Sequence, residues 1–409
     1  MLARRVALLA AVSFLPACGG GGGPAPAIVV SGVILDLDGN PAPGITVSVA
    51  EQSTVSDANG RFSLPNVSPP YVLTAVSVGA GEAVIYEGLT RSDPTIQWQQ
   101  SLSSFDRRGE ILGTIDGGVP IGALTNVMIA LGAPEALAFP GTFPTATTYA
   151  LPVTWNGPQT IIGSVHALQV TTAVLGGLPT AFPGYAVRTD VPISDGVNTP
   201  GVDLPLTPPS VGSIGGTYSL PAGYSFLGKF LALGFGDGAL IDLGGDSGQE
   251  LDFSYTLPLN IDATAMVFVF AEDAGPDGVI VGRRETGIAV GATGLVLALP
   301  QGASSIGPTD GTTSVDGQTE FSWNAFPGGV FTVDFLTGHG GPNFHVVTQA
   351  TRTTIPQIPS LPLPAGNGYT WSVGAAAPFA SVDEAASPQG SNPNTLLISF
   401  TPIRSFITR

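Results

Sequence analysis

The sequence Asp57-Ala58-Asn59-Gly60-Arg61-Phe62 places a polar turn directly before an aromatic residue. Aspartate, asparagine and glycine favour tight turns, because the first two hydrogen-bond nearby backbone groups and glycine tolerates left-handed backbone angles. Leu64 follows Phe62 at a spacing of two residues, which is the side-chain period of a β-strand. We therefore predict that Asp57 and Gly60 shape a turn and that Phe62 plugs the interior of a β-sandwich.

Turns and alternating apolar residues continue on both sides of this stretch. Residues 36–43 supply aspartate, glycine, asparagine and proline for a second turn. Apolar residues mark strands around the two turns: Val30, Val33, Leu35, Ile45, Val47, Val49, Tyr71, Leu73, Ala75 and Val76. Alternation at period two between glycine-rich turns predicts antiparallel strands with one buried face. Residues 28–103 are therefore expected to form one sandwich.

This segment resembles the carboxypeptidase regulatory-like domain. The matching residues are Gly32-Val33, Asp36, Gly39-Asn40-Pro41, Gly44, Val47, Asp57 to Phe62, Val67 and Tyr71-Val72-Leu73. Pro70 departs from the pattern, because a glycine often precedes the tyrosine in that family. The resemblance implies a small transthyretin-like β-sandwich that is non-catalytic and occurs beside unrelated domains in exported proteins.

The composition favours an all-β chain with many short strands and tight turns. The 56 glycines and 37 prolines alone would indicate disorder, but 43% of the residues are hydrophobic. No helical periodicity extends over ten residues after the N-terminal segment. Cys18 is the only cysteine, so hydrophobic cores must hold the chain together without disulfides. The predicted fold class is a series of tandem antiparallel β-sandwiches.

Residues 1–17 have the layout of an export signal. Arg4 and Arg5 precede an apolar run from Val6 to Leu15, which is too short to cross a bilayer of roughly 30 Å as a helix. Leu15-Pro16-Ala17-Cys18 resembles the lipobox of bacterial lipoproteins, with proline where that family has a small or hydroxyl residue. The resemblance implies cleavage before Cys18 and a diacylglycerol on its thiol. A plain cleaved signal with a spare cysteine is the alternative.

Residues 18–27 are expected to be a tether. The nine residues after Cys18 read GGGGGPAPA, which form no core and reach roughly 30 Å when extended. Gly19 stands where aspartate would resemble an inner-membrane retention signal. We therefore expect an outer-membrane lipoprotein that faces the periplasm or the cell surface and contacts the membrane through its N-terminal lipid.

Two central β-modules are expected at 104–209 and 210–300. Tyr149-Ala150-Leu151-Pro152 is echoed by Tyr255-Thr256-Leu257-Pro258. In the first copy a β-rich run follows at 160–170 and an apolar strand at 202–206. In the second copy the run is at 263–271 and the strand at 295–299. The duplication is compatible with two copies of a sandwich or with two halves of one.

The last segment, 301–409, resembles a fibronectin type III-like or related immunoglobulin-like module. Phe321-Ser322-Trp323 is followed by an alternating strand at 330–335 and by Tyr369-Thr370-Trp371-Ser372-Val373. The resemblance implies that Trp323 and Trp371 belong to a sandwich core, where a tryptophan of one sheet packs beneath an aromatic residue of the other.

The charge excludes nucleic acid as a partner. The formal net charge is −17, and removal of Arg4 and Arg5 changes it to −19, since 11 basic residues then face 30 acidic ones. Such an excess repels nucleic acid phosphates and anionic head groups. It suits a solvated protein of the periplasm or the cell surface.

No catalytic constellation is complete in the sequence. Gly245-Asp246-Ser247-Gly248 matches the surroundings of the serine in trypsin-like proteases, but His166, His339 and His345 all lack the sequence context of their histidine base. A zinc carboxypeptidase needs glutamate three residues after a histidine, and these three histidines have glutamine, proline and threonine there. The serine motif is explained as a turn, and we predict no enzyme.

Three groups of residues remain as candidate binding sites. Asp36, Asp38 and Asn40 have the spacing that opens a calcium loop, although Val47 stands where a bidentate glutamate is needed. A second acidic group, in a predicted loop, consists of Glu272, Asp273 and Asp277. Trp98 and Trp155 are the candidates for a sugar-stacking platform. The alternatives are turns or solvated edges for the acids and core packing for the tryptophans.

These features predict a lipid-anchored, non-catalytic protein of the cell envelope that acts in binding, adhesion or scaffolding. The expected partners are polysaccharides, bound as carbohydrate ligands, or other envelope proteins. No cofactor is expected, with calcium as the one alternative. One alternative is a carbohydrate-active or peptidase-associated enzyme with an unrecognised central site. Another is a calcium-stabilised adhesin.

Overall fold

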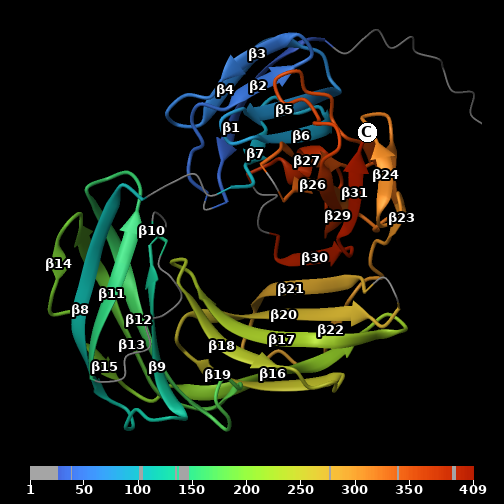
Figure 1. Ribbon diagram of the computed structural model, residues 1–409. Helices are drawn as coiled ribbons and strands as arrows, with labels where there is room; N and C mark the ends of the chain where they lie inside the picture. Colours follow the sequence, from blue (N-terminus) through green and yellow to red (C-terminus); the bar gives the residue numbers. More distant parts are fainter. Residues whose placement is uncertain are drawn as a thin grey trace, which may run out of the picture.

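The computed structural model describes residues 26–37, 39–100, 105–133, 136–137, 147–275, 278–338, 340–388 and 393–409. The described chain consists of β-strands of 2 to 16 residues arranged in stacked sheets (Figure 1), and its one helix, α1 (Val382–Ala385), has four residues. The predicted fold class, tandem β-sandwiches, is confirmed. None of the described helical residues forms a segment long and apolar enough to span a membrane.

The first sandwich has seven strands: β1 (Ile28–Leu35), β2 (Thr46–Val49), β3 (Gln52–Val55), β4 (Arg61–Val67), β5 (Tyr71–Ser77), β6 (Glu82–Leu89) and β7 (Thr95–Gln97). The sheet β4-β1-β7 packs against β6-β5-β2-β3. The predicted turn before β4 is confirmed, because Asp57 Oδ1 accepts the backbone N–H of Asn59 at 2.8 Å and of Arg61 at 2.9 Å. Gly60 has a φ of 68°, and Phe62 is buried in the core as predicted.

The second sandwich has eight strands: β8 (Arg107–Gly117), β9 (Thr125–Gly132), β10 (Ala136–Leu137), β11 (Thr148–Trp155), β12 (Thr160–Thr172), β13 (Pro179–Ser194), β14 (Asn198–Thr199) and β15 (Leu204–Leu206). The third has seven: β16 (Ser210–Ser219), β17 (Tyr224–Phe235), β18 (Leu240–Asp246), β19 (Asp252–Leu259), β20 (Ala263–Asp273), β21 (Ile280–Ile288) and β22 (Leu295–Ala298). Each encloses its own cluster of buried apolar residues.

The fourth sandwich contains nine strands: β23 (Ser305–Gly307), β24 (Thr312–Val315), β25 (Glu320–Trp323), β26 (Val330–Thr337), β27 (Asn343–Thr348), β28 (Arg352–Thr354), β29 (Gly368–Ala377), β30 (Thr395–Phe400) and β31 (Arg404–Thr408). The sheet β23-β25-β28 covers the sheet that contains β26 and β29. Trp323 and Trp371 are 2% and 1% exposed, so their predicted place in the core is confirmed.

The first three sandwiches share one strand order. In each, the first strand lies between an antiparallel and a parallel neighbour, as in β4-β1-β7, β11-β8-β15 and β19-β16-β22. The facing sheets also correspond, as β6-β5-β2, β13-β12-β9 and β21-β20-β17. The sequence echo links only the second and third sandwiches, whereas the shared strand order includes the first as well.

A glycine on the first strand of each of these sandwiches faces an aromatic residue on the neighbouring strand. The pairs are Gly32 with Phe62, Gly113 with Tyr149, and Gly216 with Phe253. Phe253 therefore corresponds to Tyr149 in the structure. The sequence alignment of Tyr149 with Tyr255 is shifted by two residues from this structural match. Residues two apart point to the same face of a strand, so apolar periodicity alone does not reveal such a shift.

The three glycines let a backbone carbonyl approach the first strand closely. A Cβ at each would lie 2.4, 1.9 and 2.1 Å from a carbonyl oxygen, those of Pro94, Val202 and Leu295 respectively. Real Cβ atoms do not come so near to backbone oxygen, so any side chain would push the parallel last strand away from the sheet. Glycine is therefore required at the same place in all three sandwiches.

One sheet of 14 strands runs through the first, fourth and third sandwiches (Figure 1). β6 pairs in parallel with β27, joining residues 82–86 to residues 343–347. β21 pairs antiparallel with β30, joining residues 280–285 to residues 395–400. The strands that would be unpaired edges of isolated sandwiches are thus paired with one another.

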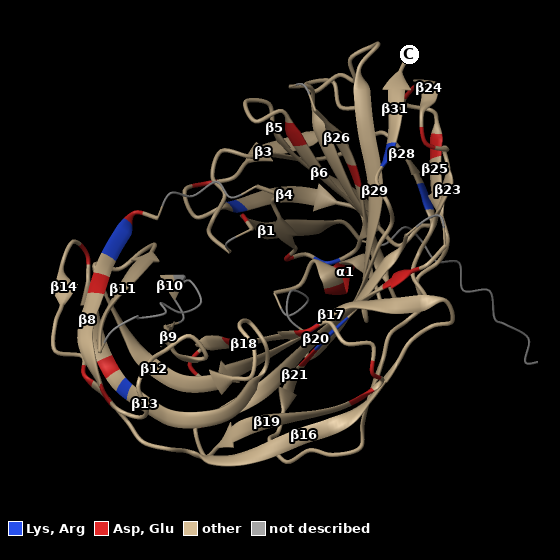
Figure 2. Ribbon diagram, turned by 60° about the horizontal axis from the view of Figure 1, so that its bottom comes forward, with Lys and Arg blue, Asp and Glu red and all other residues tan. Residues whose placement is uncertain are grey.

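The second sandwich is attached by side chains rather than by strand pairing. Ala130, Leu168, Val170 and Phe182 on its β9-β12-β13 sheet belong to the apolar cluster of the third sandwich. The four sandwiches follow a curve that brings the second towards the first (Figure 2). Asn156 Nδ2 donates to Asn40 Oδ1 at 2.7 Å between these two.

The close approach at Gly113 makes it the most sensitive of the three glycines. Gly113→Ala should lower the free energy of unfolding by roughly 3 kcal/mol, because the new methyl group overlaps the Val202 carbonyl and the structure must shift. Chemical denaturation of the full chain measures this change. Gly122→Ala is the matched control, since a Cβ there meets nothing within 4 Å. Equal effects of the two substitutions on the free energy of unfolding would contradict the requirement for glycine at position 113.

Candidate functional site

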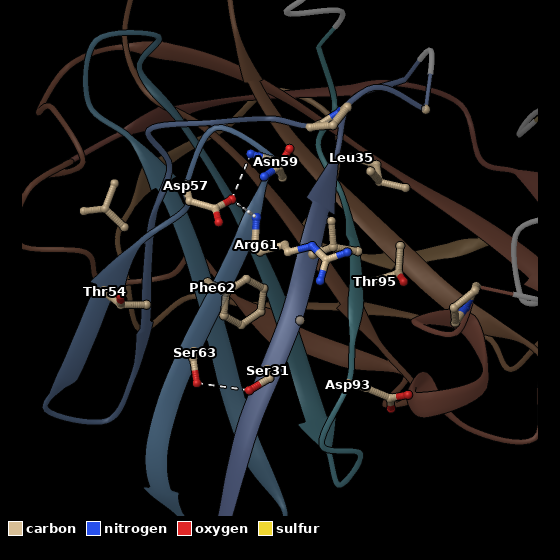
Figure 3. Close-up of a pocket in the computed structure, with 16 residues that line it drawn as sticks. Ser31, Leu35, Thr54, Asp57, Asn59, Arg61, Phe62, Ser63, Asp93 and Thr95 are labelled. Carbon is tan, nitrogen blue, oxygen red and sulfur yellow. Dashed lines mark hydrogen bonds between the residues drawn. The ribbon is translucent and has the colours of Figure 1, made fainter. Parts of the chain in front are cut away.

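An open groove crosses the outer face of the sheet β4-β1-β7 (Figure 3). Its volume is about 1120 Å³. Among the residues that line it are Ser31, Val33, Leu35, Arg61, Ser63 and Thr95. Side chains alternate along a strand, so the residues between the buried positions of β1 and β4 point to this outer face, where Ser31, Arg61 and Ser63 line the groove.

The groove offers hydroxyl groups, the guanidinium of Arg61 and the carboxylates of Asp57 and Asp93. Ser31 Oγ and Ser63 Oγ lie 3.0 Å apart, and the guanidinium of Arg61 extends across β1 towards β7 (Figure 3). A cation beside hydroxyl groups suits ligands rich in hydroxyl or carboxylate groups. The 16 lining residues include no histidine or cysteine. The groove can therefore hold a ligand through hydrogen bonds and ion pairs.

Trp98 and Trp155 are core residues, which corrects their role as a candidate sugar platform. Both are 0% exposed. Trp155 continues the inward-facing series of β11, and its Nε1 donates to the Pro158 carbonyl at 2.7 Å. Trp98 lies in the core of the first sandwich. Stacking needs an open ring face, and neither ring has one.

The first acidic group shapes a turn. Asp36 is 0% exposed, and its Oδ1 accepts the backbone N–H of Asn40 at 2.9 Å. The side chain of Asn40 accepts the hydrogen bond from Asn156. Asp38 lies outside the described residues. The described part of the candidate calcium loop is therefore occupied by hydrogen bonds within the protein.

The second acidic group lies at the end of β20. Asp273 Oδ1 accepts the backbone N–H of Gly275 at 3.1 Å, which again stabilises a turn. Glu272 is half-buried beside it, and Asp277 is outside the described residues. Within the described ranges, no three His, Cys, Asp or Glu side chains are grouped closely enough to hold a metal ion. Cys18 and His339 also lie outside these ranges.

His166 lies at the contact between the second and third sandwiches. Its Nε2 is 2.7 Å from Asp237 Oδ2, and its Nδ1 is 2.9 Å from the hydroxyl of Tyr185. Burial alone would raise the pKa of Asp237, but hydrogen bonds from His166 and from the Ala239 amide outweigh it and lower that pKa. Folding is then stabilised by the ionised carboxylate, and this contribution is lost as the pH falls through the lowered pKa.

His345 lies at the contact between the first and fourth sandwiches. Its Nδ1 is 2.6 Å from Asp334 Oδ1 on β26, and its Nε2 is 3.9 Å from Glu82 Oε1 on β6. Glu82 is 1% exposed, and its Oε1 has no hydrogen-bond partner among the described residues. Burial raises the pKa of Glu82, and the nearby His345 only partly offsets this. These three side chains form a polar contact between the first and fourth sandwiches.

The serine motif contains one partner of an ion pair, Asp246, whose other partner is the buried Lys229. Asp246 Oδ2 lies 2.9 Å from Nζ of Lys229, and Asp246 Oδ1 accepts the N–H of Gly248 at 2.7 Å. Ser247 is thus part of a Gly/Asp/Ser turn, as the alternative explanation predicted. The available signal was that Lys229 is the only lysine of the chain.

Comparison with known proteins identifies the first sandwich. Residues 29–100 match the model of the carboxypeptidase regulatory-like domain, so the resemblance is confirmed for this part. A search of curated proteins finds no match. The second, third and fourth sandwiches are therefore described from the structure alone.

Several solved structures match the chain at low sequence identity. The Bacillus anthracis TIE protein is 12% identical with a TM-score of 0.16, and the match covers 67% of this chain and 50% of that chain. BcpA, the major pilin subunit of Bacillus cereus, is 7% identical with a TM-score of 0.15, over 66% and 98% of the chains. A tetra-tandem repeat from the extending region of a large adhesion protein is 12% identical with a TM-score of 0.17, over 93% and 100%. The overall arrangements differ at such scores.

Glu82→Gln should stabilise the protein at neutral pH and have little effect at about pH 4. The pKa of Glu82 is higher in the folded than in the unfolded chain, so the wild type loses stability as the pH rises and Glu82 ionises. The neutral amide avoids that loss, which we expect to be of the order of 1 kcal/mol, the scale of an unsatisfied buried polar group.

Thermal unfolding at the two pH values measures this difference. Glu51→Gln, an exposed substitution in a turn of the same sandwich, should change neither midpoint. A Glu82→Gln protein that is less stable than the wild type at neutral pH would show that the carboxylate stabilises the joint.

Proposed function

We propose that this chain is a lipid-anchored, non-catalytic scaffold of the cell envelope that holds a binding groove away from the membrane. Cys18 carries the lipid, residues 19–27 form the tether, and the first sandwich follows directly. The outer membrane is the destination, with the folded part facing the periplasm or the cell surface. The fourth sandwich acts as a fibronectin type III-like module within this scaffold.

The continuous 14-stranded sheet is the observation that carries the proposal. Domains joined by flexible linkers move independently, whereas pairing of β6 with β27 and of β21 with β30 makes one body of three sandwiches. A body of this kind transmits force and keeps its surfaces in a set geometry. The groove of Figure 3 is open and is lined by no histidine or cysteine, which favours a binding surface over an active site.

The groove on β4-β1-β7 is the proposed binding surface. Its hydroxyl groups and the exposed guanidinium of Arg61 favour a polysaccharide or another ligand with many hydroxyl and carboxylate groups. The two carboxylates of the groove have partners within the protein: Asp57 accepts backbone N–H groups, and Asp93 pairs with Arg91 at 2.8 Å. Arg61 is then the cation that attracts an acidic polymer to a protein whose net charge otherwise repels it.

Fractionation and binding test the two parts of this proposal separately. Cys18→Ser should move the full chain from the membrane to the soluble fraction without changing its fold. Arg61→Ala should weaken binding of the Cys18→Ser protein to acidic polysaccharide at least tenfold, because the groove loses its cation. Arg352→Ala is the control, since that arginine is exposed on the fourth sandwich.

Two results would contradict the proposal. Membrane association of the Cys18→Ser protein would remove the lipid anchor from it. Turnover of a glycan, ester or peptide substrate by the wild-type chain would replace the scaffold with an enzyme.

A further inference from the structure

The only lysine of the chain is buried beside a carboxylate. Lys229 on β17 is 2% exposed and stands directly opposite Asp246 on β18, with Nζ 2.9 Å from Oδ2. Nζ also donates to the Glu250 carbonyl at 3.3 Å. The rings of Phe226 and Tyr218 lie 4.8 and 5.6 Å from Nζ. The primary amine is therefore held against one carboxyl group within an aromatic pocket.

The contacts of Asp246 distinguish its two oxygens. Oδ1 accepts the backbone N–H of Gly248 at 2.7 Å, and Oδ2 faces the amine. A fixed N–H donor stabilises negative charge that develops on the oxygen it contacts when a carbonyl carbon becomes tetrahedral. The side chain of Asp246 is 36% exposed, so a water molecule formed at Oδ2 has a path to solvent.

We propose that Lys229 and Asp246 condense to an amide that cross-links β17 to β18. A proton moves from the ammonium to Oδ2, and the nitrogen lone pair then attacks Cγ. A second proton passes from nitrogen to Oδ2, the bond from Cγ to Oδ2 breaks, and the oxygen leaves as water. The nitrogen keeps one hydrogen, and the reaction needs no oxidant, reductant or further reactant.

Arginine does not substitute for lysine in this role. The other 12 cationic side chains of the chain are arginines, counted as 13 Lys and Arg less Lys229. A guanidinium is a strong hydrogen-bond donor but a very poor nucleophile, since it stays protonated. An ion pair alone would be served equally well by arginine, so a lone buried lysine is explained by the chemistry of its amine.

The cross-link goes beyond the proposed scaffold function, and it affects the contact between the second and third sandwiches. The turn between β17 and β18 carries Asp237, which contacts His166 of the second sandwich. An amide at residues 229 and 246 closes the base of this hairpin and restricts its unfolded states, as a disulfide does. It thereby holds the contact between the second and third sandwiches in place.

Tryptic digestion of the denatured full chain tests the proposal. Trypsin cuts after free lysine and after arginine, and Arg188 and Arg283 flank the pair. With the amide formed, no cut occurs after residue 229, and one peptide, 189–283, appears with its sequence mass less one water molecule. Without it, two peptides, 189–229 and 230–283, appear at their full sequence masses, and the proposal is overturned.

Three variants assign the bond. Lys229→Arg keeps the cation but removes the amine, and Asp246→Ala removes the carboxyl group, so both should give two peptides at full mass. Asp242→Ala, on the same strand, should keep the single lighter peptide. A lighter uncut peptide from Asp246→Ala would show that Lys229 reacts elsewhere, which also contradicts the proposal.

Discussion

The pairing of edge strands between sandwiches is the constraint on which the rest of this structure depends. A β-sandwich leaves unpaired N–H and C=O groups at its edges, and here β6 pairs with β27 and β21 with β30. Successive residues of β6 then face two different cores: Val84 and Tyr86 lie in that of the first sandwich, and Ala83 and Ile85 in that of the fourth. A slip of one residue would exchange these faces, so both cores hold the register of the joint.

Titratable side chains gather at the joints of a chain in which only 11% of residues are charged. Glu82, His345 and Asp334 lie where the first and fourth sandwiches meet, and His166 and Asp237 where the second and third meet. Buried ionic groups add little net stability because desolvation offsets their attraction. Their best explanation is specificity, since a misplaced partner would leave these polar groups without their hydrogen bonds in an apolar setting.

Local features of the fold were predictable from the sequence, but contacts between distant segments were not. The turn at 57–62 and the burial of Trp323 follow from turn chemistry and period-two alternation, which act over a few residues. The β6–β27 joint unites segments about 260 residues apart, and alternation is the same whether an edge strand is paired or free. For the same reason, the surroundings of three residues could not be predicted. The burial of Trp98 and Trp155 depends on the facing sheet, and the partner of Lys229 follows only from the strand register.

Hydrogen exchange of the full chain measures most directly whether the sandwiches form one body. The amides of β27 that face β6 should exchange as slowly as those of the interior strand β26, because the joint pairs them. The free edge of β3, in the same sheet, supplies the fast reference. Exchange of these β27 amides at the rate of the β3 edge would show that the joint opens freely, and the continuous sheet could not then be the basis of the scaffold.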